Sequence, residues 1–274
     1  MKMLFMALAA MLALVPTSDG SVSVVYAGSL VRVMEGPLAT SLRRQTGLQF
    51  SGEAKGSKAL AHLIAAGLRT PDVFISADSK LLDGLMGRGE QSFISGYRIF
   101  GSARMVVAYS IRSPHRDLFE RAARGEASIL DVLANPNVRV GRTDPQLDPK
   151  GVRTVRVLQL LGKHFHRPAE ANAVLAKAEV FPEEDLAVRV ESGELDAGFF
   201  YSTETSGRGL RALELPSDAN LSREIAYAIA VLRYAPHPRA AKVFEDFVLV
   251  GGGKPVLEQA GVSYFSNPRV IGRP

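Results

Sequence analysis

The sequence of 274 residues contains neither cysteine nor tryptophan. Without cysteine, the protein has no disulfide framework, no thiolate metal site and no cysteine nucleophile. Blocks of like charge are also missing, because 33 basic and 28 acidic residues are spread along the chain and leave a net charge of +5. This balance is typical of a solvated surface, and the weak positive field would attract a small anion as well as nucleic acid. Since no basic patch is visible, we expect no nucleic-acid partner.

Long apolar runs are scarce, and none reaches the roughly 20 residues that a membrane helix needs. The most apolar stretch begins the chain, where Lys2 precedes the apolar residues 3–15 and the short zone 16–20 that contains small and polar residues. This order is typical of a signal peptide, so we expect residues 1–20 to be cleaved and the mature protein to be free in the periplasm. No cysteine is present to carry a lipid anchor. A buried N-terminal helix and an uncleaved membrane anchor are the alternatives.

Signatures of common enzymes are absent as well, including the G-x-S-x-G elbow and the H-E-x-x-H helix. The glycine run 251–253 lacks the spacing of a phosphate-binding loop. Segment 207–212 matches a relaxed dinucleotide fingerprint, but it precedes a strand-like run where the motif requires a helix. His164 and His166 are two residues apart and cannot share a helix face. We therefore expect a protein that is not an enzyme and that holds neither a cofactor nor a free metal cation.

The sequence does contain short β-branched runs that alternate with helical patterns, which indicates parallel βαβ units. With 46% hydrophobic residues, the chain is long enough to bury a core in two lobes. A first unit is predicted to contain strands over 22–26 and 72–77 and helices over 57–66 and 79–86. A second set follows, with strands over 105–111, 138–140, 197–201 and 224–232 and helices over 117–124, 128–134, 151–164, 183–192, 239–249 and 254–259. Two such units would enclose a cleft lined by strand ends, where open α/β sheets bind ligands.

Two segments share one local design, in which a strand runs into small residues and then into a helix. They are YAGSL at 26–30 and EAKGSKAL at 53–60. Gly28 and Gly56 allow the backbone to approach a ligand closely, while Ser29 and Ser57 stand where a hydroxyl and unpaired helix N–H groups point the same way. Such helix starts bind anions. The alternative is that both serines are N-caps that need no ligand.

Seven blocks along the chain resemble the substrate-binding proteins of molybdate and tungstate ABC transporters. They are YAGSL at 26–30, AKGSKAL at 54–60, PDVFISAD at 71–78, DPQLDPKGVRT at 144–154, GELDAGFFYS at 193–202, GLRALELP at 209–216 and GKPVLEQAG at 253–261. Single blocks are weak signals, but the ordered set covers nearly all of the predicted mature chain. The resemblance implies a monomeric component of an importer that captures one oxyanion and delivers it to a membrane permease.

The resemblance also implies an α/β periplasmic-binding-protein fold of type II, the venus-flytrap arrangement. We expect residues 21–104 and 232–274 to form the first lobe and residues 105–231 to form the second. Carried over by position, Ser29 and Ser57 would bind oxyanion oxygens from the first lobe. The corresponding residues of the second lobe are Asp148, Arg153 and Tyr201.

One departure from the family pattern concerns carboxylates. In the archaeal-type branch, a carboxylate pair is associated with expanding the metal centre of the oxyanion beyond four ligands, and here Phe200 stands where the second carboxylate is expected. Asp148 alone would face a dianion unfavourably unless it bonds to that metal centre, is protonated, or points to Arg153. We therefore expect tetrahedral binding by neutral donors. Asp78 matches a family position, but it would also serve as a helix cap.

Three other functions are compatible with parts of the pattern. A binding protein for another oxyanion, such as sulfate or phosphate, would use the same helix starts. A transcriptional regulator can contain a two-lobed effector domain, but the sequence begins with an apolar leader where a helix-turn-helix would be expected. A periplasmic enzyme that acts on phosphate or sulfate esters would need a nucleophile with a neighbouring base, and the sequence offers no such pair.

Overall fold

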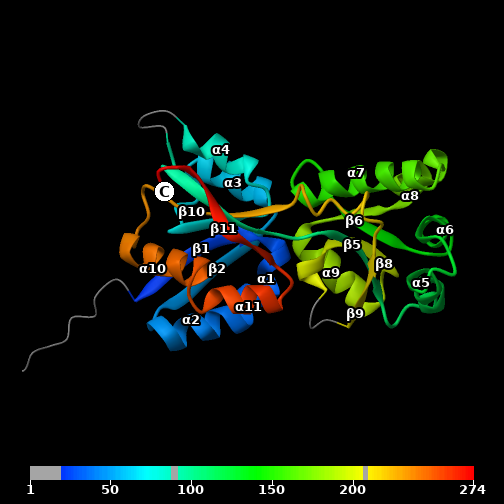
Figure 1. Cartoon of the computed structure of the whole chain (residues 1–274), viewed down its shortest axis with the longest axis horizontal. Helices are drawn as coiled ribbons and strands as arrows, with labels where there is room; N and C mark the ends of the chain where they lie inside the picture. Colours follow the sequence, from blue (N-terminus) through cyan, green and yellow to red (C-terminus); the bar gives the residue numbers. More distant parts are fainter. Residues whose placement is uncertain (1–19, 88–91, 206–208) are drawn as a thin grey trace, which may run out of the picture.

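The computed structural model describes residues 20–87, 92–205 and 209–274, which form two α/β lobes side by side (Figure 1). The predicted two-lobed fold is therefore confirmed. The predicted signal peptide, apart from its last residue, lies outside the described residues, as does part of the segment 207–212. Within the described part of the chain, no helix combines the length and apolar character needed to cross a bilayer.

The first lobe is built on a six-stranded sheet with the order β11-β4-β10-β3-β1-β2. Its strands are β1 Ser21–Ala27, β2 Gln49–Lys55, β3 Val73–Ser76, β4 Gly96–Ser102, β10 Ala226–Val231 and β11 Ser263–Gly272. Helices of this lobe are α1 Val31–Val33, α2 Ala39–Thr46, α3 Ser57–Ala65, α4 Lys80–Met86, α10 Pro238–Leu249 and α11 Gly253–Gln259. β1 pairs in parallel with both β2 and β3, as the βαβ pattern predicted, whereas β10 and β11 run antiparallel to their neighbours.

The second lobe contains a five-stranded sheet with the order β7-β6-β8-β5-β9. Its strands are β5 Met105–Ser110, β6 Val140–Thr143, β7 Glu179–Phe181, β8 Ala197–Tyr201 and β9 Leu210–Glu214. Its helices are α5 Arg116–Ala123, α6 Ile129–Ala134, α7 Pro149–His164, α8 Pro168–Lys177 and α9 Glu183–Ser192. The predicted strand 138–140 begins later, at Val140, because Val140 is the first residue that pairs with β8.

The chain passes between the lobes twice, from β4 to β5 and from β9 to β10. β10 pairs with β3 and β4 and so belongs to the first sheet. The expectation that the second lobe extends to residue 231 is corrected here, since the return crossing precedes Ala226. A strand pattern alone does not show which sheet a strand joins, so the sequence does not fix where the second lobe ends.

Buried apolar side chains form three clusters. The largest continues through both lobes, a second packs α3 and α4 on the first sheet, and a third packs α9 on the second sheet. All four residues of β3 are buried, as expected for a central strand covered on both faces. Apolar packing is therefore continuous from one lobe into the other.

Candidate functional site

The two predicted strand-to-helix segments lie together at one edge of the first sheet. We call residues 26–30 the first corner and residues 53–60 the second corner. β1 ends at Ala27 and continues into a single 3-10 turn over Gly28–Leu30, while β2 ends at Lys55 and α3 begins at Ser57. Ala27 is paired with Lys55 across the parallel strands, so both corners leave the sheet at the same level. Both serines are buried, with 3% of Ser29 and 1% of Ser57 exposed.

The second lobe lies directly on both corner glycines. A Cβ atom added at Gly28 would stand 3.0 Å from Cδ and Oε2 of Glu183. A Cβ atom added at Gly56 would stand 2.8 Å from the carbonyl oxygen of Leu147 and 3.3 Å from Cβ of Asp148. Real Cβ atoms do not approach backbone oxygen this closely, so the closed arrangement requires glycine at position 56.

The corner serines are not helix caps, and the capping alternative is wrong. The N-cap positions belong to Ala27 and Gly56, and neither helix start has a side-chain cap. The Ser29 hydroxyl lies 3.1 Å from the Tyr227 hydroxyl instead. The Ser57 hydroxyl accepts a hydrogen bond from the Ala77 amide at 3.1 Å, which leaves its own hydrogen available to a ligand.

Glu183, the first residue of α9, brings an anionic oxygen to the first corner. Its Oε1 atom accepts a hydrogen bond from the Ser29 amide at 3.0 Å, across the interface between the lobes. Its Oε2 atom is buried and has no hydrogen-bond partner among the described residues. The sequence gives no signal for this contact, because an acidic residue in the first turn of a helix is common and carries no sign of a distant partner.

Lys150, the second residue of α7, is the buried cation of the site. Its ammonium lies 2.7 Å from Oε1 of Glu204 and 3.6 Å from Oε1 of Glu183. Burial by itself lowers the pKa of Lys150, but the surrounding carboxylates Glu204, Glu183 and Asp148 outweigh it, and the net shift is upward. Lys150 therefore stays charged. No sequence pattern indicated this role, although the residue lies inside the block DPKGVRT.

Asp148 caps α7, and one of its oxygens remains unpaired. Oδ1 accepts a hydrogen bond from the Lys150 amide at 2.8 Å, whereas Oδ2 is buried without a partner among the described residues. Burial raises the pKa of Asp148, and nearby Lys150 only partly opposes that shift. This burial makes the Asp148 carboxyl group easier to protonate than an exposed aspartate.

Arg153 links the buried site to the first lobe. Its Nη1 atom donates to the Tyr201 hydroxyl at 2.8 Å, and its Nη2 atom lies 3.4 Å from Oδ2 of Asp78. Its ion-pair partner is thus Asp78 and not Asp148. Asp78 also accepts from the Lys80 amide at 3.0 Å, so it supports the start of α4 while it pairs with Arg153.

Phe200 and Tyr201 lie on opposite faces of β8. Phe200 packs into the apolar cluster under α9, with the Lys150 ammonium 5.3 Å from its ring centre, and Tyr201 belongs to the large central cluster. Position 200 thus contributes an apolar ring under α9. A second carboxylate nevertheless reaches the site, and it comes from Glu183 at the start of α9.

The buried groups contain more acid than base. Three buried carboxyl groups, those of Asp148, Glu183 and Glu204, lie with two buried cations, Lys150 and Arg153. Arg153 is also paired with Asp78. Burial, followed by the charge of Asp148, raises the pKa of Glu183 well above its usual range. Neutral carboxyl groups can donate a hydrogen bond to an anion, so protonation converts repulsive groups into donors.

Comparisons with known proteins give the family. The molybdate/tungstate-binding protein WtpA of Pyrococcus abyssi is 26% identical, over 91% of this chain and 86% of its own length. The solved structure of the periplasmic molybdate-binding protein of Azotobacter vinelandii is similar over 88% of this chain and 98% of its own chain. The TM-score is 0.69 and the sequence identity is 19%. For the sulfate-binding protein SubI of Mycobacterium tuberculosis, the similarity covers 90% of this chain and 87% of that one, with a TM-score of 0.63 and 13% identity.

At these identities the two solved structures establish likeness of fold alone. A putative ABC transporter molybdenum-binding protein of Haloferax volcanii is 32% identical, over 92% of this chain and 85% of its own length. A model of the bacterial extracellular solute-binding proteins matches residues 22–263. These two matches, which extend over nearly the whole chain, show that the protein belongs to the bacterial extracellular solute-binding protein family.

Proposed function

We propose that this protein is the substrate-binding component of an ABC importer and holds one tetrahedral oxyanion, molybdate or tungstate, between its lobes. Relatives named as molybdenum-binding and molybdate/tungstate-binding proteins support this ligand class. In this proposal the protein is exported to the periplasm, acts as a monomer and delivers its ligand to a membrane permease. The proposed ligand contacts are Gly28, Ser29, Gly56, Ser57, Asp148, Arg153 and Tyr201.

The contact between Glu183 and the Ser29 amide is the observation that carries the proposal. A carboxylate oxygen from the second lobe lies 3.0 Å from an amide nitrogen at the first corner. Glu183 thereby stands in for an oxygen of an oxyanion, with the same charge type and the same hydrogen-bond geometry. An amide that binds one anionic oxygen in a buried interface is suited to bind another.

Hydrogen-bond donors converge on the same place from both lobes. The Ser57 hydroxyl has a free hydrogen, and the Arg153 guanidinium reaches the Tyr201 hydroxyl. Burial raises the pKa of Asp148, and with a proton bound this carboxyl group would also donate a hydrogen bond. For a dianion to bind, Glu183 has to leave the Ser29 amide or take up a proton, since two anions cannot share one donor in a buried site.

The proposed mechanism is hinge closure about the two crossings between the lobes. In the open form, the corners of the first lobe would be accessible to the anion. On closure, Asp148 and Glu183 cover Gly56 and Gly28 as they do in this structure. The permease would then recognise the closed form.

A thermal-shift panel of molybdate, tungstate, sulfate and phosphate tests the proposal. Ligand at 1,000 times its dissociation constant stabilises the folded state by about 4 kcal/mol, and we expect this for molybdate and tungstate. Stabilisation by sulfate alone would reassign the ligand. Turnover of a phosphate or sulfate ester by the purified protein would contradict a purely binding role.

Substitution of the corner serines tests the location of the ligand. We expect Ser29→Ala or Ser57→Ala to weaken oxyanion binding by about 1–3 kcal/mol, the cost of leaving a buried acceptor unpaired. Ser51→Ala on the exposed part of β2 is the matched control and should leave the affinity unchanged. Unchanged affinity in both corner variants would place the anion elsewhere.

A further inference from the structure

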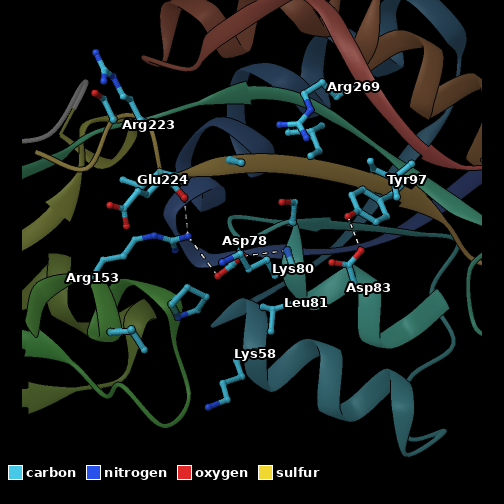
Figure 2. A pocket seen from close by; sticks show the side chains of 18 of the residues that line it. Lys58, Asp78, Lys80, Leu81, Asp83, Tyr97, Arg153, Arg223, Glu224 and Arg269 are labelled. Atoms are coloured by element: carbon cyan, nitrogen blue, oxygen red, sulfur yellow. Dashed lines mark hydrogen bonds and ion pairs between the residues drawn. The ribbon is translucent and has the colours of Figure 1, made fainter. Parts of the chain in front are cut away.

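A large basic cavity lies between the lobes beside the buried site (Figure 2). Its volume is about 1050 Å³, which is at the upper end of the range for pockets that hold organic molecules and far more than a four-oxygen anion needs. Neither Ser29 nor Ser57 lines it, so it is separate from the proposed oxyanion site. Arg153 is shared, because it contacts Tyr201 in the buried site and Asp78 in the cavity.

The acidic residues of the cavity wall are already engaged. Asp78 pairs with Arg153 at 3.4 Å, and Glu224 pairs with Arg156 at 2.8 Å. Asp83 accepts a hydrogen bond from the Tyr97 hydroxyl at 2.7 Å. Burial, followed by this hydrogen bond, raises the pKa of Tyr97 to about 12. Asp78 and Glu224 are therefore each paired with an arginine, and Asp83, whose described partner is a neutral hydroxyl, is the one carboxylate of the described wall without a cationic partner. One carboxylate does not balance the four remaining cations of the wall.

Four basic side chains of the wall have no carboxylate partner among the described residues. They are Lys58 of α3, Lys80 of α4, Arg269 of β11 and Arg223 of the second crossing. Lys80 and Arg269 are exposed on the first lobe, and Figure 2 shows Lys58 and Arg223 at opposite margins of the view. The cavity therefore carries an uncompensated positive charge contributed from several directions, which favours a ligand with more than one negative group.

Apolar residues also line the cavity. They include Ile99, Ile225, Leu81, Phe265 and Ile271. A bare inorganic anion gains nothing from an apolar wall, whereas a ligand with a hydrocarbon or aromatic body buries surface against it. A lining that combines cations with apolar side chains thus matches an organic polyanion.

We propose that this cavity is a second binding site, for an organic anion that carries two or more negative groups on an apolar body. Its wall is contributed by both lobes and by the second crossing, so an occupant would stabilise the closed arrangement. Because the oxyanion would also bind the closed arrangement, occupancy of one site would raise the affinity of the other.

Fluorescence anisotropy of pyrene-1,3,6,8-tetrasulfonate, titrated with the purified protein, tests the proposal. This probe has an aromatic body and four negative groups. We expect saturable binding of one probe per protein, weakened at least tenfold in the double variant Lys80→Ala/Arg269→Ala. Lys163→Ala, an exposed residue of α7 outside the cavity, should bind the probe like the unmodified protein.

Two further measurements separate this site from the oxyanion site. Ser29→Ala should retain probe binding, so loss of oxyanion binding would leave the second site intact and the two proposals can fail separately. Equal binding of neutral 1-pyrenebutanol, or unchanged probe binding in the double variant, would overturn the proposal. Slower oxyanion association in that variant without any probe binding would also overturn it, because the cations would then only steer small anions.

Discussion

Replacement of Glu183 by glutamine should increase oxyanion affinity. In this structure its carboxylate accepts the Ser29 amide hydrogen at 3.0 Å, and an incoming oxyanion must take over that donor. A hydrogen bond to a charged group contributes about 1.5–3 kcal/mol and a neutral one about 0.5–1.5 kcal/mol. Glutamine keeps the shape of the side chain but forms only a neutral hydrogen bond, which an oxyanion displaces at a lower cost. We expect a gain of about 1–2 kcal/mol, or roughly tenfold in the dissociation constant.

The gain should depend on pH, and its sign follows from the raised pKa of Glu183. Below that raised pKa the carboxyl group is neutral and glutamine imitates it, so the two proteins should bind alike. Above it the carboxylate repels the dianion, so affinity of the unmodified protein falls while that of the variant stays level. Calorimetric titration with molybdate across a pH series measures both trends.

Glu194→Gln provides the matched control, because this carboxylate is 52% exposed and lies beyond the end of α9. It should change neither the affinity nor its pH dependence. A loss of affinity in Glu183→Gln at every pH would refute the reasoning, since Glu183 would then be a ligand contact and not a competitor for the amide.

Three other predictions concern the same buried groups. Lys150→Met should lower the free energy of unfolding in urea by about 3–5 kcal/mol, because buried carboxylates lose their cation, whereas exposed Lys163→Met should have little effect. Gly56→Ala should weaken oxyanion binding by about 1–3 kcal/mol, because its Cβ would meet a backbone oxygen of the second lobe. The same clash should enlarge the radius of gyration in X-ray scattering. Gly84→Ala in α4 is the control, since its Cβ would meet no atom within 4 Å. Without ligand, the melting temperature should fall as pH rises from about 4.3 to the raised pKa of Glu183, since the folded state binds more protons than the unfolded state there, and Glu183→Gln should flatten that slope.

Elements with strong local signals were predictable from the sequence. The pattern over 183–192 gave α9 with its observed bounds, and the apolar run 197–201 gave β8. In contrast, β4 and β11 were not predicted. Both pair over long sequence distances, with a register shift between Tyr264 and Arg269 that breaks the alternation of side chains. Their formation depends on partners that no local window contains.

Only some residues of the candidate site were predictable from the sequence. Gly28 and Gly56 were identifiable because a strand, a small residue and a helix start follow one another in the chain. Glu183 was not, because its contact with Ser29 spans 154 positions and exists only when the lobes close. Position 200 was readable as apolar, but the sequence around it gives no sign that Glu183 of another element brings a carboxylate to the first corner.

A crystal structure of the protein with tungstate would test the central claim most directly, because tungsten is located without ambiguity by its anomalous scattering. We predict one tungsten atom between Ser29 and Ser57, with an oxygen on the Ser29 amide, four oxygens around the metal and the Glu183 carboxylate moved off that amide. A tungsten atom outside this interface, or Glu183 still bonded to the Ser29 amide beside a bound anion, would contradict the account. A carboxylate oxygen of Asp148 bonded to the metal would contradict the prediction of tetrahedral binding.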